Sequence, residues 1–542
     1  MLYRKMIIFL YNFLLAVLQC RIFIGCRPST VNAPAVIFFP FIPGQLNCGF
    51  AGLMTCRLPN RPAVTTADFT VAALWKKIKS AGLQTISTRK NNAADYLGGR
   101  ETIAAVAMAV AELKREDVQE FLFFQKDRVA ALAVIAGEMK QLLADEEKLL
   151  DKQTTVINSV ELEIINSRLL LIKDIGWMLE YDILSNLQKV LALTGAADTS
   201  LVKPASFRKY RKLNLLLNAL DRLEVRGRDS AGIQLTFTIN DEKEMTEINR
   251  IICQNKWLED YQRRTQKGDL INHSIAIAAS PNNGAGKTSI TFTYKTFSVV
   301  GELGRNVAQL RNDIQNDRIL QCFADAETFC ETALAHTRWA SVGSISEDNC
   351  HPVNNFTTNQ GLSVYPLYPG TAAEINVVLN GDIDNYPALR QDLEAGAAMI
   401  APQITTDTKI IPLQIEKYLQ AGENLTCAFR LAVNDFAGSH AIAMTSNLEP
   451  GKTFLALRGS GQSIYVGISN DQYLFSSELY GVVEVMPHFL RMNGEAGHGA
   501  AAGQIFVLDQ DGGGSQGISA FFYDGAIMQL TDDELQTAEI TT

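Results

Sequence analysis

The chain has 542 residues, with 49 Lys and Arg against 58 Asp and Glu, which gives a formal net charge of −9. This acidic balance, without a long basic run, excludes an electrostatic basis for nucleic-acid binding, so no nucleic-acid partner is expected. A hydrophobic content of 47% and a length sufficient for more than one domain are typical of an ordinary globular protein.

Residues 1–47 form an apolar leader. The basic start MLYRK is followed by a short apolar run that ends before Arg21, and a second apolar patch, APAVIFFPFIPG, contains three prolines. A membrane span needs roughly twenty apolar residues, so a membrane anchor is the least favoured interpretation. The alternatives are a removable signal or propeptide, or translated sequence upstream of the real start.

The segment LNCGFAGL at 46–53 follows, in which Cys48 precedes small and apolar residues that predict a short buried strand. Taken alone, a cysteine in such a place is most simply a core thiol. The open alternatives are half of a disulfide, or a nucleophile whose own α-amine must be set free.

Apolar residues recur at intervals of three and four from about residue 66 to 222, with charged residues between them. This period predicts amphipathic α-helices, and Gly and Asn/Asp clusters divide the region into several of them. A bundle that packs on itself is the simplest interpretation, and a partner-binding helical module is the alternative.

From residue 230 onward, short runs rich in Val, Ile, Thr, Phe and Tyr end at Gly, Asn or Asp, which predicts strands. Helical stretches lie between them at 305–315, 386–396 and 408–422. We predict an α+β fold with layered αββα sheets whose strands return by hairpins. The strands are expected at 231–239, 289–300, 332–342, 375–381, 439–446, 453–459, 463–469, 473–479 and 504–510.

The strand at Cys48 is expected to join these sheets, so the helical region is interpreted as an insertion into one domain. We place the first strand of that domain at 48–65, the insertion at 66–215 and the remainder of the domain at 216–510. Residues 511–542 are assigned to the end of the domain and the start of a linker.

The GAGKTS segment at 284–289 is the first candidate binding motif. A phosphate-binding loop needs a glycine five positions before the glycine of Gly-Lys, and then a helix whose N-terminus faces the phosphates. Pro281 occupies that position, and the following ITFTYKTF predicts a strand. A hairpin loop is therefore the favoured interpretation, and no nucleotide site is expected.

Cysteine usage bears on metals and on the cellular compartment. The nine cysteines are odd in number and scattered, and none of them forms a CxxC pair. Neither a zinc site nor a disulfide framework is indicated, and a reducing, cytoplasmic location fits best. We expect no metal and no cofactor.

Dense polar islands lie at the ends of apolar runs, where main-chain amides and polar side chains converge on ligands. There are four of them, at 222–233, 335–352, 377–386 and 405–409. Together with the Cys-Gly strand they resemble the glutaminase domain of class II glutamine amidotransferases. The resemblance is carried, in family order, by CGFAG at 48–52, RGRDSAG at 226–232, HTRWASVG at 336–343, NCHP at 349–352, NGDIDNY at 380–386 and TDT at 406–408.

Within that class, the RG-x-DSAG and HTRWA motifs are most similar to the glutamine–fructose-6-phosphate aminotransferase (glucosamine-6-phosphate synthase) family. The resemblance covers about 48–54 and 216–542, and leaves out the leader and most of the helical insertion. It implies the four-layer αββα sandwich of N-terminal-nucleophile hydrolases, with L-glutamine as the substrate.

The resemblance also assigns the chemistry. Cys48 corresponds to the family's nucleophile, whose base is its own α-amine, with an unperturbed pKa of about 7.7–8.0. A main-chain amide cannot act as this base because its lone pair is delocalised, so cleavage between Asn47 and Cys48 is expected. The family usually exposes the cysteine by trimming Met, and Asn47 departs from that pattern.

The Asn380 side chain and the Gly381 N–H correspond to the family's oxyanion donors. The resemblance implies that Arg338 binds the glutamine α-carboxylate, that Asp407 binds the α-ammonium group, and that Trp339 covers the pocket on a mobile loop, 338–346. His351 and Arg226 match motif residues close to the site. Three positions depart from the family pattern: the second histidine of the RWA motif is replaced by Val342, the histidine before Asn-Gly by Leu379, and a glutamate after TDT by Lys409.

The family implies a glutaminase whose ammonia passes to sugar-isomerase domains acting on fructose 6-phosphate, and a matching segment is not found in this sequence. A sugar-isomerase partner is therefore expected as a separate polypeptide or in missing sequence, and membrane association is not. Two other functions remain open: a non-catalytic regulatory module in which Cys48 stays acylated by its leader, and an exported hydrolase acting on another amide.

Overall fold

The computed structural model describes residues 48–56, 67–84, 93–153, 157–265, 272–279, 287–298, 301–356, 373–396, 398–469, 471–482, 486, 488–497, 499, 502–530 and 536–537. The leader at 1–47 lies outside these described residues. Within them, no helix combines the length and the apolar character that crossing a bilayer requires, and no cluster of His, Cys, Asp and Glu is arranged to hold a metal ion.

The larger sheet places the strand that follows Cys48 near its centre. Strand β1 pairs antiparallel with β5 on one side and with β11 on the other. The strand order is β16-β12-β10-β11-β1-β5-β2-β4-β3. The strands are β1 Gly49–Thr55, β2 Ser230–Ile239, β3 Ser274–Ala279, β4 Thr288–Phe297, β5 Thr328–Arg338, β10 Tyr465–Ile468, β11 Gln472–Ser476, β12 His488–Arg491 and β16 Gln536–Thr537.

The second sheet is also antiparallel and has the order β15-β14-β13-β9-β8-β7-β6. Its strands are β6 Val353–Asn354, β7 Ile375–Gly381, β8 His440–Ser446, β9 Lys452–Arg458, β13 Gln504–Asp509, β14 Ile518–Phe522 and β15 Ile527–Met528.

The two sheets face each other across a shared apolar core. Alternate strand residues point to opposite faces, so each sheet offers one apolar face to the other and one to helices. The inner core joins Phe50, Met54 and Phe475 of the larger sheet to Leu455 and Phe506 of the second. Separate cores lie between each sheet and its own helices. These four layers confirm the predicted α+β, αββα fold.

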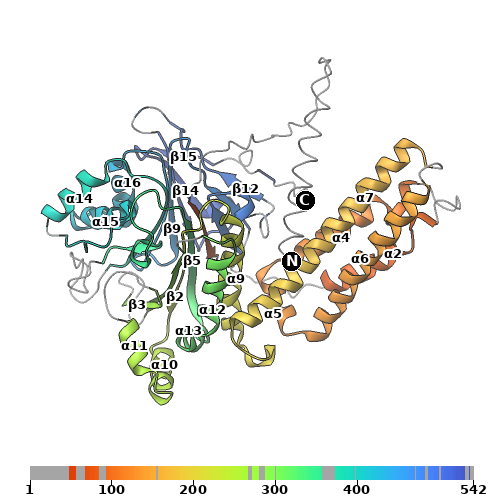
Figure 1. Cartoon of the computed structure of the whole chain (residues 1–542), viewed down its shortest axis with the longest axis horizontal. Coiled ribbons are helices and arrows are strands. Elements are labelled where there is room, and N and C mark those ends of the chain that lie inside the picture. Colours follow the sequence, from red (N-terminus) through yellow and green to blue (C-terminus); the bar gives the residue numbers. More distant parts are fainter. Residues whose placement is uncertain are drawn as a thin grey trace. The chain divides into compact units, whose positions relative to one another are not determined.

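The helices that cover the second sheet are α14 Tyr386–Ala395, α15 Ile410–Gln420 and α16 Leu425–Asp435. Those beside the larger sheet are α9 Pro204–Leu223, α10 Glu242–Gln254, α11 Leu258–Arg264, α12 Arg305–Gln315 and α13 Arg318–Ala324. Figure 1 shows α14, α15 and α16 on one side of the strands, and α9, α12 and α13 beside β5 and β2 on the other.

Between β1 and α9 the described residues are mostly helical, as the apolar period predicts. Figure 1 shows α2, α4, α6 and α7 packed along one another. The elements are α2 Ala67–Lys79, α4 Gly99–Glu112, α5 Glu116–Phe123, α6 Lys126–Gln153, α7 Ser159–Trp177, a π-helical segment η3 Met178–Ser185, and α8 Asn186–Leu193. Short 3-10 helices are η2 Ala93–Gly98, η4 Thr199–Leu201, η5 Glu347–Asn349, η6 Asp407–Lys409, η7 Leu479–Gly481 and η9 Gly514–Gly517.

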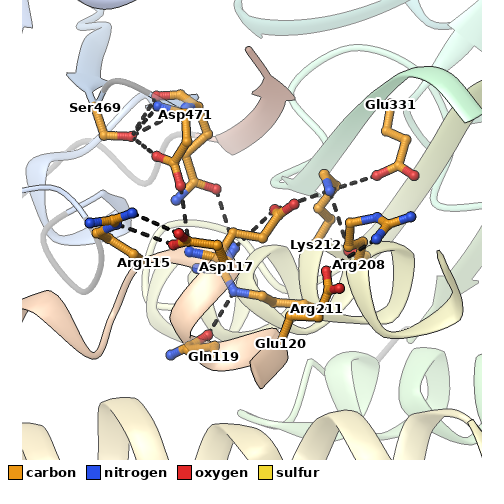
Figure 2. Close-up of polar contacts among 12 residues, drawn as sticks. Arg115, Asp117, Gln119, Glu120, Arg208, Arg211, Lys212, Glu331, Ser469 and Asp471 are labelled. Atoms are coloured by element: carbon orange, nitrogen blue, oxygen red, sulfur yellow. Dashed lines mark hydrogen bonds and ion pairs between the residues drawn. The ribbon is translucent and has the colours of Figure 1, made fainter. Parts of the chain in front are cut away.

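Helix α9 is buried over most of its length, and the buried part carries Lys209, Arg211 and Lys212, next to the half-buried Arg208. These charges are tolerated because they are paired inside the protein. Figure 2 shows the cluster, which we call the α9 network. Its members on other elements are Arg115, Glu116, Asp117, Gln119 and Glu120 at α5, Glu331 on β5, and Ser469, Asp471 and Gln472 at β11.

The central contact of the α9 network is made by Lys212. Its Nζ lies 2.6 Å from Glu331 and 3.2 Å from Glu116. Arg211 donates to Gln119 at 2.6 Å and to Gln472 at 3.3 Å. Helix α9 thus ties the helical region to β5 and to β11, the two strands that flank β1.

The GAGKTS segment precedes a strand rather than a helix. Strands β3 and β4 pair as an antiparallel hairpin, with Ala279 opposite Thr288, and residues 280–286 lie outside the described residues. The Lys287 Nζ lies 3.6 Å from the centre of the Phe329 ring. A strand after the motif lacks the helix N-terminus that binds phosphate, which supports the hairpin interpretation.

Candidate functional site

Cys48 immediately precedes β1 and lies beside the end of β5. Gly49 pairs with Thr337, which brings the cysteine next to Trp339. The Sγ atom donates to the Trp339 carbonyl and accepts from the Trp339 N–H, both at 3.3 Å. Gly49 is closely packed, because a Cβ there would lie 3.0 Å from the Cβ of Leu223 at the end of α9.

The Cys48 thiol is kept neutral by its surroundings. Burial raises the pKa of the thiol to about 11, against the opposing effects of the Trp339 N–H and of the Arg338 charge. Asp407 and Asp382 act in the same direction as burial. Attack by sulfur therefore needs a group that takes its proton, and Sγ makes no hydrogen bond to a carboxylate or an imidazole among the described residues.

Asn380 and Gly381 end strand β7 of the second sheet. The Asn380 Nδ2 donates to the Cys48 carbonyl at 2.8 Å, so the two sheets meet at the cysteine. Gly381 has φ 92°, and a Cβ on it would lie 2.1 Å from the Ser439 carbonyl oxygen. This left-handed turn is open only to glycine, which fixes the direction of the chain after Asn380.

Arg338, at the end of β5, is a buried cation at 3% exposure. Its Nη1 donates to the Ser344 carbonyl at 2.9 Å and its Nη2 donates to the Val342 carbonyl, so the loop after β5 folds back over the guanidinium group. No carboxylate of the described part of the chain forms an ion pair with it. The site therefore retains a positive charge that a ligand carboxylate can neutralise.

Asp407, at the start of η6, is the matching buried anion at 4% exposure. Its Oδ2 accepts from the Ile383 N–H at 2.9 Å. Burial raises the pKa of Asp407 to about 6, and the nearby Asp382 charge adds to this, while the Ile383 N–H and Arg338 oppose it. A cationic group of a ligand placed beside it would lower this pKa again.

His351 lies beneath the Asp407 segment and makes no hydrogen bond to the thiol in the described structure. Its Nε2 lies 2.8 Å from the Thr408 hydroxyl, and its ring centre lies 4.2 Å from that of His336. Burial is the main cause that holds the pKa of His351 well below its usual range, and the neighbouring His336 acts in the same direction. Burial also lowers the pKa of His336 to about 3. Both rings are therefore neutral packing partners and poor bases.

Arg226 forms an ion pair with Glu478. The preceding Ser477 binds strand β1 on both sides of Phe50: its hydroxyl accepts from the Phe50 N–H at 3.1 Å, and its N–H donates to the Phe50 carbonyl at 2.9 Å. Arg226 is therefore linked to β1 indirectly, through Glu478 and the adjacent Ser477. In the described structure no hydrogen bond joins Arg226 to Cys48. Trp339 is half-buried, and its main chain rather than its ring holds the thiol.

Two residues within the quoted motifs have roles that the motifs did not reveal. The Asp229 carboxylate accepts from the Ala340 N–H at 3.0 Å, and the Asp229 N–H donates to the Arg338 carbonyl at 3.1 Å. Asn349 bonds to both the loop after β5 and the segment before Asp407. Their place inside the quoted motifs was the only available signal.

The three departures from the family pattern fall on positions whose contacts are compatible with the new residue. The main-chain carbonyl of Val342 accepts from Arg338, and that of Leu379 lies 2.8 Å from the His336 Nε2. The buried Lys409 donates to the Phe356 carbonyl at 2.5 Å. The first two contacts use the main chain and are independent of the side chain.

No protein-family model matches the chain, but comparison with known proteins gives several named relatives. Over 178 residues the chain is 29% identical to the glutamine–fructose-6-phosphate aminotransferase of Methanothermobacter thermautotrophicus, covering 33% of this chain and 26% of that protein. The enzyme of the same name from Acidithiobacillus ferridurans is 31% identical over 155 residues, 29% of this chain and 22% of that one.

A third relative with this name, from Pseudomonas putida, is 24% identical over 312 residues, which cover 58% of this chain and 37% of the relative. Among solved structures, a glutamine PRPP amidotransferase from B. subtilis aligns with a TM-score of 0.31 at 14% identity, covering 55% of this chain and 50% of that chain. A TM-score this low adds nothing to the fold assignment, which rests on the sheets and cores described above.

Part of this chain is thus similar in sequence to part of each of these glutamine-dependent aminotransferases. The relatives that carry this resemblance are glutamine–fructose-6-phosphate aminotransferases, as the motifs predict. The chain spans between about a fifth and two fifths of the length of these relatives.

Proposed function

We propose that this chain hydrolyses L-glutamine at Cys48. The observation that carries the proposal is the meeting of the two sheets at this cysteine, with Trp339 on its thiol and Asn380 on its carbonyl. The thiol sulfur attacks the side-chain amide carbon of glutamine, the thiol proton leaves with ammonia, and a thioester remains. Water then cleaves the thioester to give glutamate and the free thiol.

The groups around the thiol fit the parts of this reaction. The Asn380 amide and the Gly381 N–H donate to the oxygen that becomes negative in the tetrahedral intermediate. Arg338 binds the α-carboxylate of glutamine as a planar two-donor group, and Asp407 binds the α-ammonium group. The Trp339 side chain and the 338–346 loop cover the bound substrate, and His351 and Arg226 support its surroundings.

The base in this proposal is the α-amine of Cys48. The two histidines near the site are held neutral by burial and make no hydrogen bond to Sγ in the described structure. A free α-amine has a pKa near neutrality, and it is attached to the Cα that carries the thiol. The proposal therefore requires that the chain be cut between Asn47 and Cys48.

The ammonia is proposed to serve the synthesis of glucosamine 6-phosphate from fructose 6-phosphate. The support is the name of the relatives, whose length this chain spans only in part. A sugar-isomerase domain or subunit is the partner that this reaction requires, and the cytoplasm is the compartment where we expect it.

The test is an intact-mass measurement combined with a glutaminase assay. We expect active material to begin at Cys48 and to release glutamate and ammonia in equal amounts, and Cys48→Ala to abolish both. Active material whose Cys48 nitrogen is still bound to Asn47 would refute the α-amine as base. A mature chain that ignores glutamine but cleaves another amide would instead identify a different hydrolase. A folded, inert chain whose Cys48 nitrogen is still bound to the leader would identify a regulatory module.

A further inference from the structure

Asn349 is fully buried at the end of η5, and its side-chain amide contacts two separate segments of the chain. One is the loop after β5, where Nδ2 donates to the Ser344 hydroxyl at 2.9 Å and to the Ser346 hydroxyl at 2.9 Å. The other lies before Asp407, where Nδ2 donates to the Gln403 carbonyl at 3.0 Å.

The acceptor side of the same amide is also fully used. The Asn349 Oδ1 accepts from the Thr405 N–H at 2.8 Å and from the Thr406 N–H at 2.9 Å. A side-chain amide has two N–H donors and two oxygen lone pairs, so one N–H is shared between two of the three acceptors, and the amide is saturated by protein groups. A buried amide satisfied by two segments fixes their separation, because a shift of either one leaves a polar group unpaired.

Each of these segments carries one of the two buried charges of the site. The Ser344 carbonyl holds the Arg338 Nη1 at 2.9 Å, and the Ser344 N–H donates to the Thr405 hydroxyl at 3.2 Å. Thr406 directly precedes Asp407. The Asn349 amide therefore links the support of the guanidinium group to the support of the carboxylate.

We propose that Asn349 is the positioning residue that sets the distance between the Arg338 guanidinium and the Asp407 carboxylate, and with it the selectivity for a free α-amino acid. This inference rests on the proposed function, in which these two charges bind the two ends of the amino-acid group. A ligand that carries both a carboxylate and an ammonium group binds more tightly when the spacing of the two protein charges is already fixed. Binding then has no free-energy cost for ordering the site.

The experiment measures L-glutamine binding and turnover in Asn349→Ala. Binding is measured in a Cys48→Ala background, where no turnover occurs, and KM and kcat are measured with Cys48 intact. We expect the Kd and the KM for L-glutamine to rise about tenfold or more, and kcat to fall less than KM rises. The preference for L-glutamine over N-acetyl-L-glutamine, which lacks the ammonium group, should fall by a similar factor.

Two measurements separate positioning from a general loss of structure. Alkylation of Cys48 by iodoacetamide, which has no amino-acid group, should keep its rate within about twofold. The matched control is Asn355→Ala. Asn355 is also fully buried; its Nδ2 donates to the Ala373 carbonyl at 3.0 Å, and its Oδ1 accepts from the N–H of Ile375, the first residue of β7, at 2.9 Å. It should lower the melting temperature while leaving the KM for glutamine and the substrate preference unchanged.

Each outcome decides the matter. A folded Asn349→Ala with unchanged Kd and KM overturns the inference, as does an equal rise in Asn355→Ala. If Asn349→Ala does not fold, Asn349→Asp replaces it, since it keeps the oxygen acceptor and loses the N–H donors, and the same rise in KM is expected. If the mature parent protein neither binds nor hydrolyses L-glutamine, the proposed function fails first and this inference fails with it.

Discussion

The α9 network and the site at Cys48 both bury charged side chains, but the groups that bind those charges differ. In the network, Lys212 lies between two carboxylates, those of Glu116 and Glu331. At the site, Arg338 is held by carbonyls and Asp407 by an N–H, and within the described residues neither is paired with an opposite charge on the protein.

This difference separates a structural cluster from a binding site. A buried charge without a partner lowers stability, and it persists where a ligand supplies the missing charge. The pKa values agree with this division. Burial pushes the pKa of Glu331 upward, yet Lys212 and Lys209 outweigh it and hold that pKa well below its usual range. Asp407 has no such partner, and its pKa is raised to about 6.

The largest expected effect comes from breaking the network. Glu331→Gln removes the anion that Lys209 and Lys212 share, and a buried ion pair that loses one member costs about 3–5 kcal/mol of unfolding free energy. Urea unfolding measures the loss. Lys203→Ala, which breaks the solvent-exposed pair with Asp325, is the control and should change stability by less than about 1 kcal/mol.

The same network sets an acid limit on stability. The pKa of Glu331 is depressed in the folded state, so its contribution is present above the ordinary glutamate pKa of about 4.3 and is lost as pH falls below it. Glu331→Gln should therefore show a smaller loss of unfolding free energy between pH 6 and pH 3 than the parent protein. Equal losses in the two proteins would contradict a charged, paired Glu331.

Removing an oxyanion donor comes next. Asn380→Ala should lower kcat for glutamine hydrolysis by roughly a hundred- to a thousandfold, or about 3–4 kcal/mol of barrier, with little change in the melting temperature. Steady-state kinetics with a thermal melt check this. A kcat within a few-fold of the parent value would show that the amide of Asn380 only holds the Cys48 carbonyl.

Changing the cation at the site sharpens the comparison further. Arg338→Lys keeps the positive charge but loses the planar pair of donors, so we expect the KM for L-glutamine to rise about tenfold or more while the fold is retained. An unchanged KM would disprove the assignment of Arg338 to the α-carboxylate.

The last prediction, and the most diagnostic one, concerns the unpaired anion. Asp407→Asn removes a charge that the empty site does not compensate. It should raise the unfolding free energy at pH 7.5 by an amount on the order of 1–3 kcal/mol, while glutamine binding is lost. Because the folded pKa is raised, the penalty grows as pH rises from about 4 to about 6, so the two proteins should be equally stable near pH 4. A less stable Asp407→Asn protein at pH 7.5 would show that this carboxylate has a structural role.

Much of the fold followed from the sequence because the apolar periods were clear. The stretch at 305–315 coincides with helix α12, and 375–381 with strand β7. The order of the motifs also indicated which residues gather at Cys48, and the structure places Trp339 and Asn380 in contact with it.

What the sequence did not reveal were contacts between distant segments. Charges on α9 follow the pattern of a solvent-facing helix, and only the fold shows that Glu116 and Glu331, far apart along the chain, enclose Lys212. The roles of Asn349 and Asp229 were hidden for another reason. Their side chains bind main-chain groups of the neighbouring loops, and the residue types do not show which main-chain groups will be bound.

The buried lysine of α9 also limits how the protein can be shortened. Excising 66–215 to obtain a minimal catalytic core would cut through α9, which runs from Pro204 to Leu223, and would discard both Lys212 and Glu116. Glu331 would then face an apolar sheet surface without a counterion, so a compact version needs a designed apolar replacement at this position as well as a new linker.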